Sequence, residues 1–378
     1  MKIAIATSGR FHVLDLAREL HRLGHEVKFY SYVPVARAEK FGLPAACQRC
    51  LLRYVLPLAY LSNRGPAFLR RLADLLLIQL LDRVIAWKLE KCDVFIGMSG
   101  LCVASARAAR SKYGAKIFIE RGSTHILRQC VVQEQLQRIG AQTPPIPARE
   151  VRRELASYDL ADVIVIPSLH VEESFQPYPG PREKLFRNPY GAELAQFLPT
   201  ATPPSLPRTL LFVGQWSYRK GCDLWERVMR DLPGVRLIHV GGWGDAPRPK
   251  TGQFVHHDAV NEWELPKYYA QAHVFVLASR EEGLAKVLLQ AAACGVPIVC
   301  TDQTGGRDLW PMLGDESLVR VVPVDDVAAF IGAVQQALAM AIKQPGPRSL
   351  PVEKREQLSW RAYAQRYSAR LAQAGPAA

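Results

Sequence analysis

The chain has 378 residues, with 48 Lys and Arg against 35 Asp and Glu, which gives a formal net charge of +13. This length allows two domains with full cores, and the balance of 49% hydrophobic and 22% charged residues excludes a disordered or fibrous chain. The positive excess favours acidic partners, which can be nucleic acid, an anionic membrane surface or phosphorylated substrates.

Apolar strands and amphipathic helices alternate along the first half of the chain. Residues 2–7 are predicted as a strand and Phe11 to Leu23 as a helix that Gly24 ends, and further strands are predicted at 27–31, 94–97, 117–120 and 163–167. This alternation predicts an α/β fold, with a parallel sheet and helices on both faces. The sequence shows no secretory signal and no run of 18 apolar residues, so we expect a cytoplasmic protein without a spanning helix.

Residues 37–91 are both basic and apolar, with ten Lys or Arg against four acids. Pro66 to Lys91 is predicted as a strongly apolar helix with a narrow polar stripe at positions 71, 74, 79, 82 and 83. A basic, apolar face suits the headgroups of an anionic bilayer, and a buried helix explains the pattern equally well. Cys47 and Cys50 form a lone CxxC, which we interpret as coincidence and not as a zinc or redox site.

A second series of alternating elements begins after Pro203 and Pro204. Its strands are predicted at 209–213, 235–240, 274–277 and 298–301. Each half therefore has the pattern of a doubly wound nucleotide-binding fold. The hinge is predicted near 188–191, just before a Pro-rich stretch at 199–207. The domains are predicted at 1–190 and 191–355, followed by a terminal helix at 356–378 with aromatics at 360, 363 and 367.

The turn after strand 274–277 has the features of an anion site. A helix is predicted to follow from about Leu284 to Ala293. The backbone N–H groups of Gly283, Leu284 and Ala285 would then point outward, unpaired, at the positive end of the helix dipole.

Two polar residues flank this site. Glu282 lies at its lip, and Gln290 lies eight residues on, about two helical turns along nearly the same face. The tail of the segment reads Ala291-Ala292-Ala293-Cys294-Gly295-Val296-Pro297. Together these residues resemble the signature of the retaining, nucleotide-sugar-dependent glycosyltransferases of the glycogen-synthase-like group. This group is glycosyltransferase family four, also called glycosyl transferases group 1. That family has two carboxylates at this spacing. Glu282 matches the first, which implies a catalytic role beside the donor sugar. Gln290 replaces the second, which usually holds the ribose hydroxyls; its carbonyl can still accept a hydrogen bond but carries no charge.

The resemblance extends to other donor-binding residues. Phe212 to Gly221 is similar to the family form F-V-G-R-x-x-x-x-K-G, whose Arg and Lys grip the donor diphosphate. Gly214 and Lys220 match, Gln215 stands at the usual Arg, and Arg219 is expected to supply the missing charge. Fixed cations at this place would stabilise the departing nucleoside diphosphate.

In the first half of the chain, candidate site residues are assigned from the order of the predicted strands and helices. The resemblance implies that Gly9 meets the donor phosphate from across the cleft and that His125 acts as a catalytic group beside the donor sugar. A buried structural histidine is the alternative for His125. His12 and Arg121 are assigned to the acceptor side.

The resemblance implies a GT-B fold, in which two Rossmann-like domains face a cleft and the C-terminal helix crosses back onto the N-terminal domain. It implies hexosyl transfer with retention, from a nucleotide-diphosphate sugar to a glycan or lipid-linked glycan of polysaccharide or lipopolysaccharide assembly, at the inner face of the membrane. It also implies no cofactor and no metal, and the sequence has no Asp-x-Asp to hold one.

Two other interpretations stay open. One is a non-catalytic protein that binds nucleotide, glycan or nucleic acid, which the net charge and Gln290 favour. The other is a nucleotide-sugar epimerase or a phosphorylase of the same architecture. The basic residues form no recognisable nucleic-acid module and do not interleave with aromatics, so we expect no nucleic-acid partner.

Overall fold

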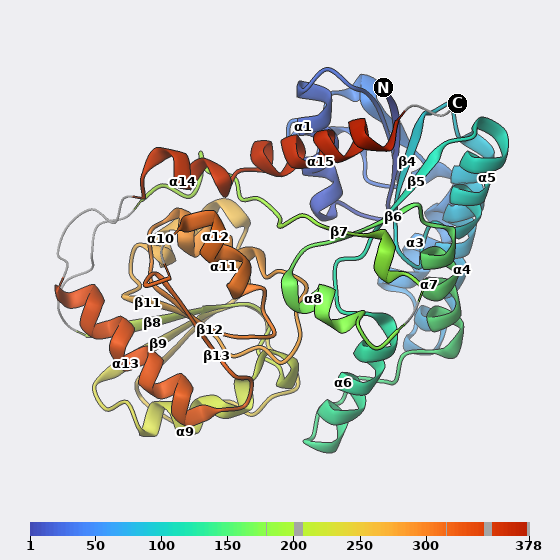
Figure 1. The fold of residues 1–378 in the computed structure, drawn as a ribbon. Helices are drawn as coiled ribbons and strands as arrows, with labels where there is room; N and C mark the ends of the chain where they lie inside the picture. The colour runs from blue at the N-terminus through green and yellow to red at the C-terminus, as the bar shows by residue number, and fades with distance from the viewer. Residues whose placement is uncertain (179, 200–206, 315, 344–349, 376–378) are drawn as a thin grey trace.

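The computed structural model describes residues 1–178, 180–199, 207–314, 316–343 and 350–375. These residues form two α/β units, each built on a parallel sheet between layers of helices (Figure 1). The first sheet has seven strands in the order β3-β2-β1-β4-β5-β6-β7, and the second has six in the order β10-β9-β8-β11-β12-β13. In each sheet the strand order reverses once, beside β1 and beside β8, as in doubly wound folds.

The strands of the first sheet are β1 (Lys2–Ala6), β2 (Glu26–Ser31), β3 (Gln48–Cys50), β4 (Val94–Met98), β5 (Lys116–Glu120), β6 (Val163–Ile166) and β7 (Leu185–Arg187). Those of the second are β8 (Arg208–Val213), β9 (Val235–Val240), β10 (Phe254–His257), β11 (Val274–Leu277), β12 (Ile298–Thr301) and β13 (Val319–Val322).

The helices of the first unit are α1 (Phe11–Arg22), α2 (Val35–Glu39), α3 (Leu52–Arg64), α4 (Ala67–Lys88), α5 (Val103–Tyr113), α6 (Ile126–Arg138), α7 (Ala148–Leu160) and α8 (Leu169–Ser174). Those that follow are α9 (Trp225–Arg230), α10 (Pro266–Tyr269), α11 (Lys286–Ala293), α12 (Leu309–Leu313), α13 (Val327–Lys343), α14 (Val352–Gln357) and α15 (Trp360–Ala374).

The central strands lie where the apolar runs predict them. β11 and β12 are buried along their whole length and have the predicted bounds. The sequence pattern does not predict β3, β7, β10 and β13, and each of these is the outermost strand at one edge of its sheet. Their residues are mostly half-buried, so they lack the continuous apolar run that marks a central parallel strand.

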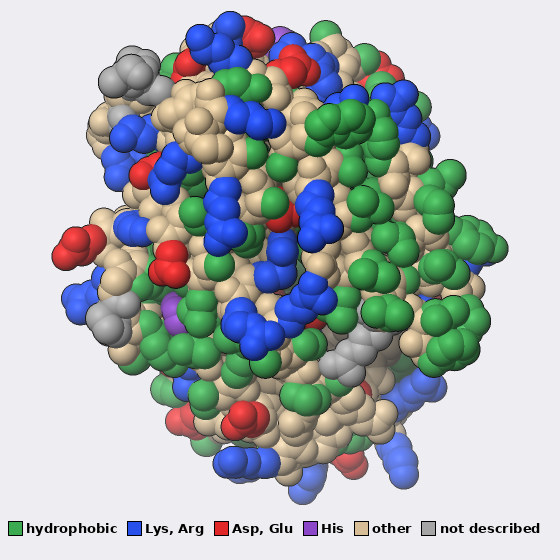
Figure 2. Space-filling model, turned by 90° about the vertical axis from the view of Figure 1, so that its right-hand side faces the viewer, with side chains coloured by type: hydrophobic (Ala, Val, Ile, Leu, Met, Phe, Trp, Pro, Cys, Tyr) green, Lys and Arg blue, Asp and Glu red, His purple; other side chains and the backbone are tan. Residues whose placement is uncertain are grey.

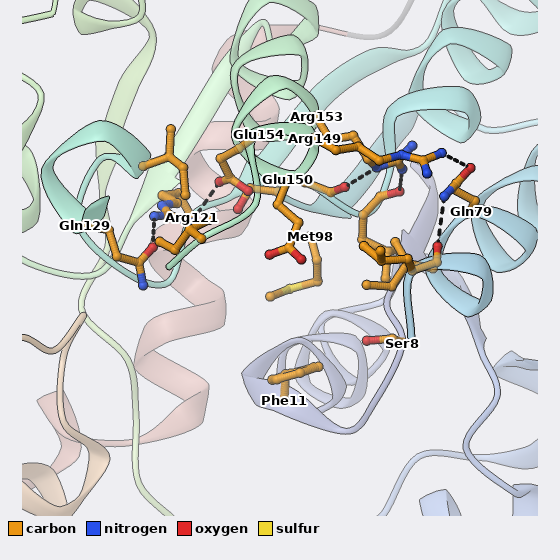
Figure 3. A pocket seen from close by; sticks show the side chains of 17 residues that line it. Ser8, Phe11, Gln79, Met98, Arg121, Gln129, Arg149, Glu150, Arg153 and Glu154 are labelled. Carbon is orange, nitrogen blue, oxygen red and sulfur yellow. Dashed lines mark hydrogen bonds and ion pairs between the residues drawn. The ribbon is translucent and has the colours of Figure 1, made fainter. Parts of the chain in front are cut away.

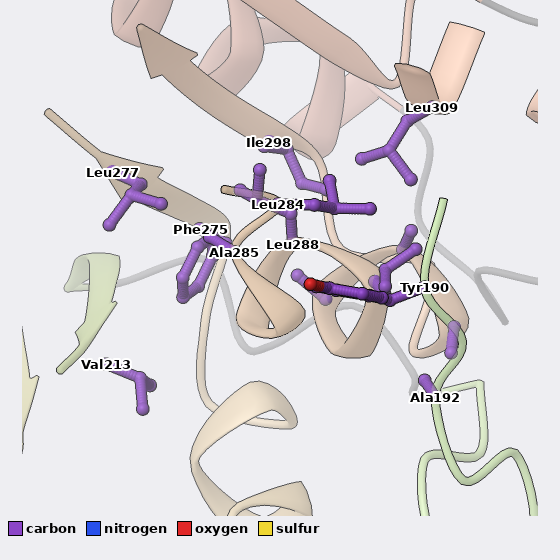
Figure 4. Packing of buried hydrophobic residues seen from close by; sticks show 14 of the residues in the cluster. Tyr190, Ala192, Val213, Phe275, Leu277, Leu284, Ala285, Leu288, Ile298 and Leu309 are labelled. Atoms are coloured by element: carbon purple, nitrogen blue, oxygen red, sulfur yellow. The ribbon is translucent and has the colours of Figure 1, made fainter. Parts of the chain in front are cut away.

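The chain crosses between the units and later returns. Tyr190 and Ala192 of the crossing segment lie beside α11, in the same core cluster (Figure 4). At the other end α14 packs on α12, and α15 lies back across α1 of the first unit (Figure 1). Tyr363 and Tyr367 of α15 are fully buried there, which confirms the GT-B arrangement with a returning helix.

The residue boundaries predicted for the three segments stay predictions. The described part agrees with them in layout, since the first sheet ends at Arg187 and the second begins at Arg208. Most of the predicted Pro-rich stretch, residues 200–206, lies outside the described residues.

The apolar, basic segment forms an antiparallel pair of helices, α3 and α4, on the outside of the first unit. The predicted polar stripe on α4 is wrong at Asp82, which is 1% exposed. Its carboxylate accepts hydrogen bonds from the backbone N–H groups of Val103, Ala104 and Ser105 and so caps the buried start of α5. Within the described ranges, no helix is both long and apolar enough to cross a bilayer.

Candidate active site between the two domains

The loops at the carboxyl ends of the two sheets face each other where the two domains meet, and we call this place the interdomain cleft. Gly9 and Arg10 follow β1, and Gly122 and Ser123 follow β5 in the first unit. The turn after β11 faces them from the second unit. At Gly283 a Cβ atom would lie 1.8 Å from the Gly122 carbonyl oxygen, so only glycine allows the two domains to approach this closely. Open α/β sheets bind ligands in this place, outside the carboxyl ends of the strands where the strand order reverses.

The turn after β11 differs in one detail from its prediction. The helix begins at Lys286, and the N–H of Ala285 is paired with the Thr304 carbonyl at 3.1 Å, so the expectation that it is free is wrong. In the described part of the chain, the N–H groups of Gly283 and Leu284 have no hydrogen-bond partner. Two of the three expected donors are therefore available to an anion.

Glu282 is held between two cations. Lys220 Nζ contacts its carboxylate, and Arg219 lies 3.6 Å away. Burial would raise the pKa of the Glu282 carboxyl, but Lys220 and Arg219 outweigh burial and hold the pKa below its usual range. Glu282 is therefore ionised at neutral pH. The structure brings Glu282, Lys220 and Arg219 together at one point, as the sequence predicts.

The glycine turn after β8 lies next to this cluster. Gly214 has a φ of 150° and its carbonyl accepts a hydrogen bond from His239 Nε2 at 2.8 Å. Burial, more than the neighbouring histidines, lowers the pKa of His239 to about 4 and keeps the ring neutral. Gln215 is exposed and, in the described residues, is not among the partners of Glu282.

Gln290 is buried one layer behind the cleft. Its Oε1 accepts a hydrogen bond from the Tyr269 hydroxyl at 3.0 Å, and its Nε2 donates to Glu262 Oε1 at 3.1 Å. Glu262 also pairs with Arg10 across the cleft at 3.0 Å. No sequence motif predicts the pairing of Glu262 with Arg10, because the two residues follow strands of different domains.

Further contacts join the domains around Glu282. Ser123 Oγ of the first unit donates a hydrogen bond to the carboxylate of Glu281, which precedes Glu282 in the chain. His170 Nε2 donates to the Glu282 carbonyl at 2.7 Å, and Ser168 Oγ donates to the Gly283 carbonyl at 2.6 Å. The first unit therefore holds the backbone of the turn that carries Glu282. No sequence pattern points to Glu281, Ser168 or His170.

A pocket of about 380 Å³ opens in the first unit at its own switch point, between the ends of β1 and β4 (Figure 3). Phe11 and Met98 lie on facing sides of it, and Leu75 and Ile78 of α4 add apolar wall. Arg121 lines it from the end of β5. The pocket therefore combines an apolar interior with charged groups at its wall.

The three first-unit side chains predicted for the site differ in position. Arg121 lines the pocket, but its charge is neutralised by Glu154 at 2.9 Å. His12 is 7% exposed and bonds Glu120 at 2.9 Å, behind the cleft. His125 is 1% exposed, caps α6 and stacks on Tyr178.

Burial, with a smaller effect of Arg121, lowers the pKa of His125 to about 4. These surroundings match the alternative of a buried structural histidine. A catalytic role for His125 stays a prediction, as do the roles assigned to the other site residues.

The second half of the chain is similar to a known protein family. Residues 207–340 match the family model described as "Glycosyl transferases group 1". The second unit is a group 1 glycosyl transferase domain. This glycosyl transferase domain runs from β8 to α13 and contains Lys220, Glu282 and Gln290.

Curated relatives match about half of the chain. One subunit of the Arabidopsis thaliana phosphatidylinositol N-acetylglucosaminyltransferase is 25% identical over 48% of this chain and 42% of its own length. A GDP-mannose-dependent alpha-(1-6)-phosphatidylinositol monomannoside mannosyltransferase of Mycolicibacterium smegmatis is 29% identical over 47% of this chain and 53% of its own length. The chain thus spans about half the length of these relatives of the glycosyl transferase domain.

Solved structures resemble the whole fold. The sucrose-phosphate synthase of Thermosynechococcus elongatus superposes with a TM-score of 0.68 at 18% identity, covering 99% of both chains. The lipopolysaccharide outer core galactosyltransferase WaaB has a TM-score of 0.63 at 15% identity, covering 99% of this chain and 100% of its own. The glycosyl transferase domain and the first unit are therefore arranged as in GT-B glycosyltransferases.

The described residues of both units contain no group of three or more His, Cys, Asp or Glu arranged to hold a metal ion. That the glycosyl transferase domain acts without a metal or cofactor stays a prediction from the sequence resemblance. Turnover in the presence of EDTA tests it.

Proposed function

We propose that the protein transfers a hexosyl group from a nucleotide-diphosphate sugar to an acceptor, with retention of anomeric configuration. The observation that carries the proposal is the group of charged residues around Glu282, where the strand order of the second sheet reverses. There Lys220 and Arg219 hold an ionised carboxylate beside the N–H groups of Gly283 and Leu284, which have no partner among the described residues. Cations and helix-terminal N–H groups together form a site for a diphosphate.

A bound diphosphate would compete with Glu282 for the two cations. Glu282 would then be free to hold the hydroxyls of the donor sugar in the cleft. The same cations would stabilise the charge that develops on the departing nucleoside diphosphate. The pocket between β1 and β4 lies in the first unit, opposite the proposed donor site, and we assign it to the acceptor.

A thermal-shift panel of UDP, GDP, ADP and their sugar conjugates is the direct test of the donor. The hit is then incubated with candidate acceptors, and the product linkage is determined by NMR. Release of nucleoside diphosphate with an α-linked product from an α-linked donor supports the proposal. Binding without turnover would instead favour a non-catalytic nucleotide-binding protein, and conversion of the free nucleotide sugar would favour an epimerase.

The acceptor is proposed to be a lipid-linked glycan at the cytoplasmic face of the membrane. Two relatives are named for phosphatidylinositol substrates, which supports a lipid acceptor. The outer helices α3 and α4 expose large apolar side chains, namely Leu56, Tyr60, Phe68, Leu72, Leu76 and Trp87. We call these six residues the apolar face. Figure 2 shows apolar side chains gathered on this side of the molecule next to a group of basic ones.

Charge complementarity selects an anionic bilayer as the partner of the apolar face. Four arginines of the same two helices are exposed, Arg53, Arg64, Arg70 and Arg83, against one exposed acid, Asp74, since Asp82 is buried. Basic residues around apolar side chains are the pattern of proteins that lie on anionic headgroups. Leu75 and Ile78 of α4 line the acceptor pocket, so a lipid held at this face would have its head group near the pocket.

Sedimentation with vesicles tests this surface. We expect binding to phosphatidylglycerol-containing vesicles, weaker binding to pure phosphatidylcholine, and loss of binding in Phe68→Ser/Leu72→Ser. The double variant Leu198→Ser/Trp263→Ser, which removes exposed apolar residues elsewhere, is the control. Equal binding by both double variants would contradict the proposed surface.

A further inference from the structure

Both ends of the Gln290 amide are already engaged by the protein. The residue is 4% exposed, and its carbonyl oxygen is turned towards the hydroxyl of the fully buried Tyr269. Its amide group points the other way, to Glu262. The Tyr269 hydroxyl also lies 3.2 Å from the Val287 carbonyl, so Gln290 belongs to a closed hydrogen-bond network inside the protein.

Glu262 lies where Gln290 does not reach, at the surface of the cleft. It begins the short turn η5 (Glu262–Glu264), which follows β10 at the carboxyl end of the sheet. The side chain is 23% exposed and its second oxygen faces Arg10 of the first unit. Asn261 and Glu264 form a capping box that fixes the backbone of this turn. The carboxylate is therefore exposed to the cleft and preorganised.

Gln290 and Glu262 are chemically matched. A glutamate at position 290 would place a second carboxylate about 3 Å from Glu262, where two like charges cannot both be ionised. The amide removes this repulsion and donates a hydrogen bond to Glu262 instead. Glutamine at 290 thus allows the negative charge to be placed one side chain further towards the cleft.

We propose that Glu262 is the residue that binds the ribose hydroxyls of the donor nucleotide, with Gln290 as its positioning residue. A ribose presents two neighbouring O–H donors, and a carboxylate offers two acceptor oxygens. Doubly wound nucleotide-binding domains commonly hold the ribose with an acidic side chain near the carboxyl ends of the strands. Arg10 is the partner that the ribose would displace from Glu262. This inference rests on the proposed function, because it requires a nucleotide in the cleft.

Calorimetry with ribose-modified nucleotides tests the inference. UDP, GDP and ADP are titrated first, and the one that binds best is compared with its 2′,3′-dideoxy form. We expect the parent to prefer the ribose form about tenfold or more, since two hydrogen bonds to a charged acceptor are lost in the dideoxy form. Glu262→Gln should lower this preference to near one. Glu262→Gln/Gln290→Glu should not recover it, because a carboxylate at the buried position 290 does not reach the surface of the cleft.

The outcomes separate the two proposals. An undiminished ribose preference in folded Glu262→Gln would overturn the role of Glu262 and leave the proposed function intact. Failure of every nucleotide to bind the parent would overturn the proposed function and this inference with it. Glu226→Gln, at an exposed position of α9, changes the net charge equally and is the control. An equal loss of preference in that control would also overturn the inference, because the effect would then follow charge and not position.

Discussion

At the scale of single residues, the charge on Glu282 depends on its neighbours. Lys220 and Arg219 lower the pKa of its carboxyl against the opposing effect of burial. A carboxylate that stays ionised can accept hydrogen bonds from sugar hydroxyls throughout the neutral pH range. The neighbouring Glu281 shares Arg219 at 3.6 Å and is held in addition by Ser123 and Thr124 across the domain interface.

The first prediction compares these two neighbours. Glu282→Gln should lower kcat by roughly 100-fold or more, the scale expected for a group that acts in the transition state. Glu281→Gln should mainly raise KM, because it weakens a contact between domains. Steady-state kinetics on both variants, with circular dichroism as a check of folding, measures the difference. Near-normal kcat in folded Glu282→Gln would remove this residue from the mechanism.

The second prediction concerns the two cations. Lys220→Ala should weaken nucleoside-diphosphate binding by about 1.5–3 kcal/mol, the range for a charged hydrogen bond. Arg219→Ala should weaken it less, because Arg219 is 43% exposed against 12% for Lys220 and water screens its charge. Arg227→Ala, which removes an exposed cation of α9 in the same domain, is the control and should bind like the parent. If both cation variants also bind like the parent in calorimetry, the diphosphate lies elsewhere.

The sequence predicts the part of the site that is local in the chain. Glu282, Gly283 and Lys220 each stand in a short strand–turn pattern, and these residues do lie at the switch point. Glu262 and Arg10 could not be found this way, because they are 252 residues apart and meet only through folding. For His125 the pattern predicts the correct place at the end of β5, but only the packed aromatic neighbours show that its ring is enclosed.

At the scale of elements, position within a sheet decides what the sequence reveals. A central parallel strand such as β11 is covered on both faces and must be apolar throughout. An edge strand such as β10 has half-buried residues throughout, and polar residues such as His256 and His257 are accommodated there. The four strands missed by sequence analysis are missed for this reason, although the layered architecture was predicted correctly.

Asp82 provides the third prediction, because it joins two elements. It caps α5 through three backbone N–H groups and also pairs with Arg153 at 2.9 Å. Asp82→Ala should lower the free energy of unfolding by about 3 kcal/mol, since it removes a helix cap and leaves a partly buried cation without its partner. Asp74→Ala removes an exposed acid from the same helix and should cost less than about 1 kcal/mol. Urea unfolding of the two variants measures the contrast, and equal losses would show that the cap contributes little.

At the scale of the whole molecule, the two domains are joined by buried polar contacts as well as by α15. Asp308 of the second unit accepts the backbone N–H of Leu169 with both oxygens, at 3.1 and 2.9 Å. Leu169 begins α8, close to the contacts of Ser168 and His170 with the Glu282 turn. Protonation of the Asp308 carboxyl therefore affects a contact that holds the two domains together beside the cleft.

The last prediction follows from the titration of Asp308. Burial raises its pKa to about 6, against the opposing effects of the Leu169 hydrogen bond, Arg187 and Arg307. The folded protein therefore binds this proton more tightly than the unfolded chain, whose Asp has a pKa of about 3.9. By linkage, the stability that the protonated carboxyl contributes is fully present below about pH 4 and is lost as the pH rises through about 6.

Asp308→Asn mimics the protonated form at every pH and keeps one acceptor for Leu169. Its melting temperature should equal that of the parent near pH 4 and exceed it at pH 7, by an amount equivalent to about 3 kcal/mol. Other titrating groups are common to both proteins and cancel in the difference. Glu173→Gln removes an exposed ion pair with Arg307 at the same interface and should change the melting temperature little at either pH. A lower melting temperature for Asp308→Asn at pH 7 would mean that the ionised carboxylate stabilises the start of α8, and that its charge helps to hold the domains together.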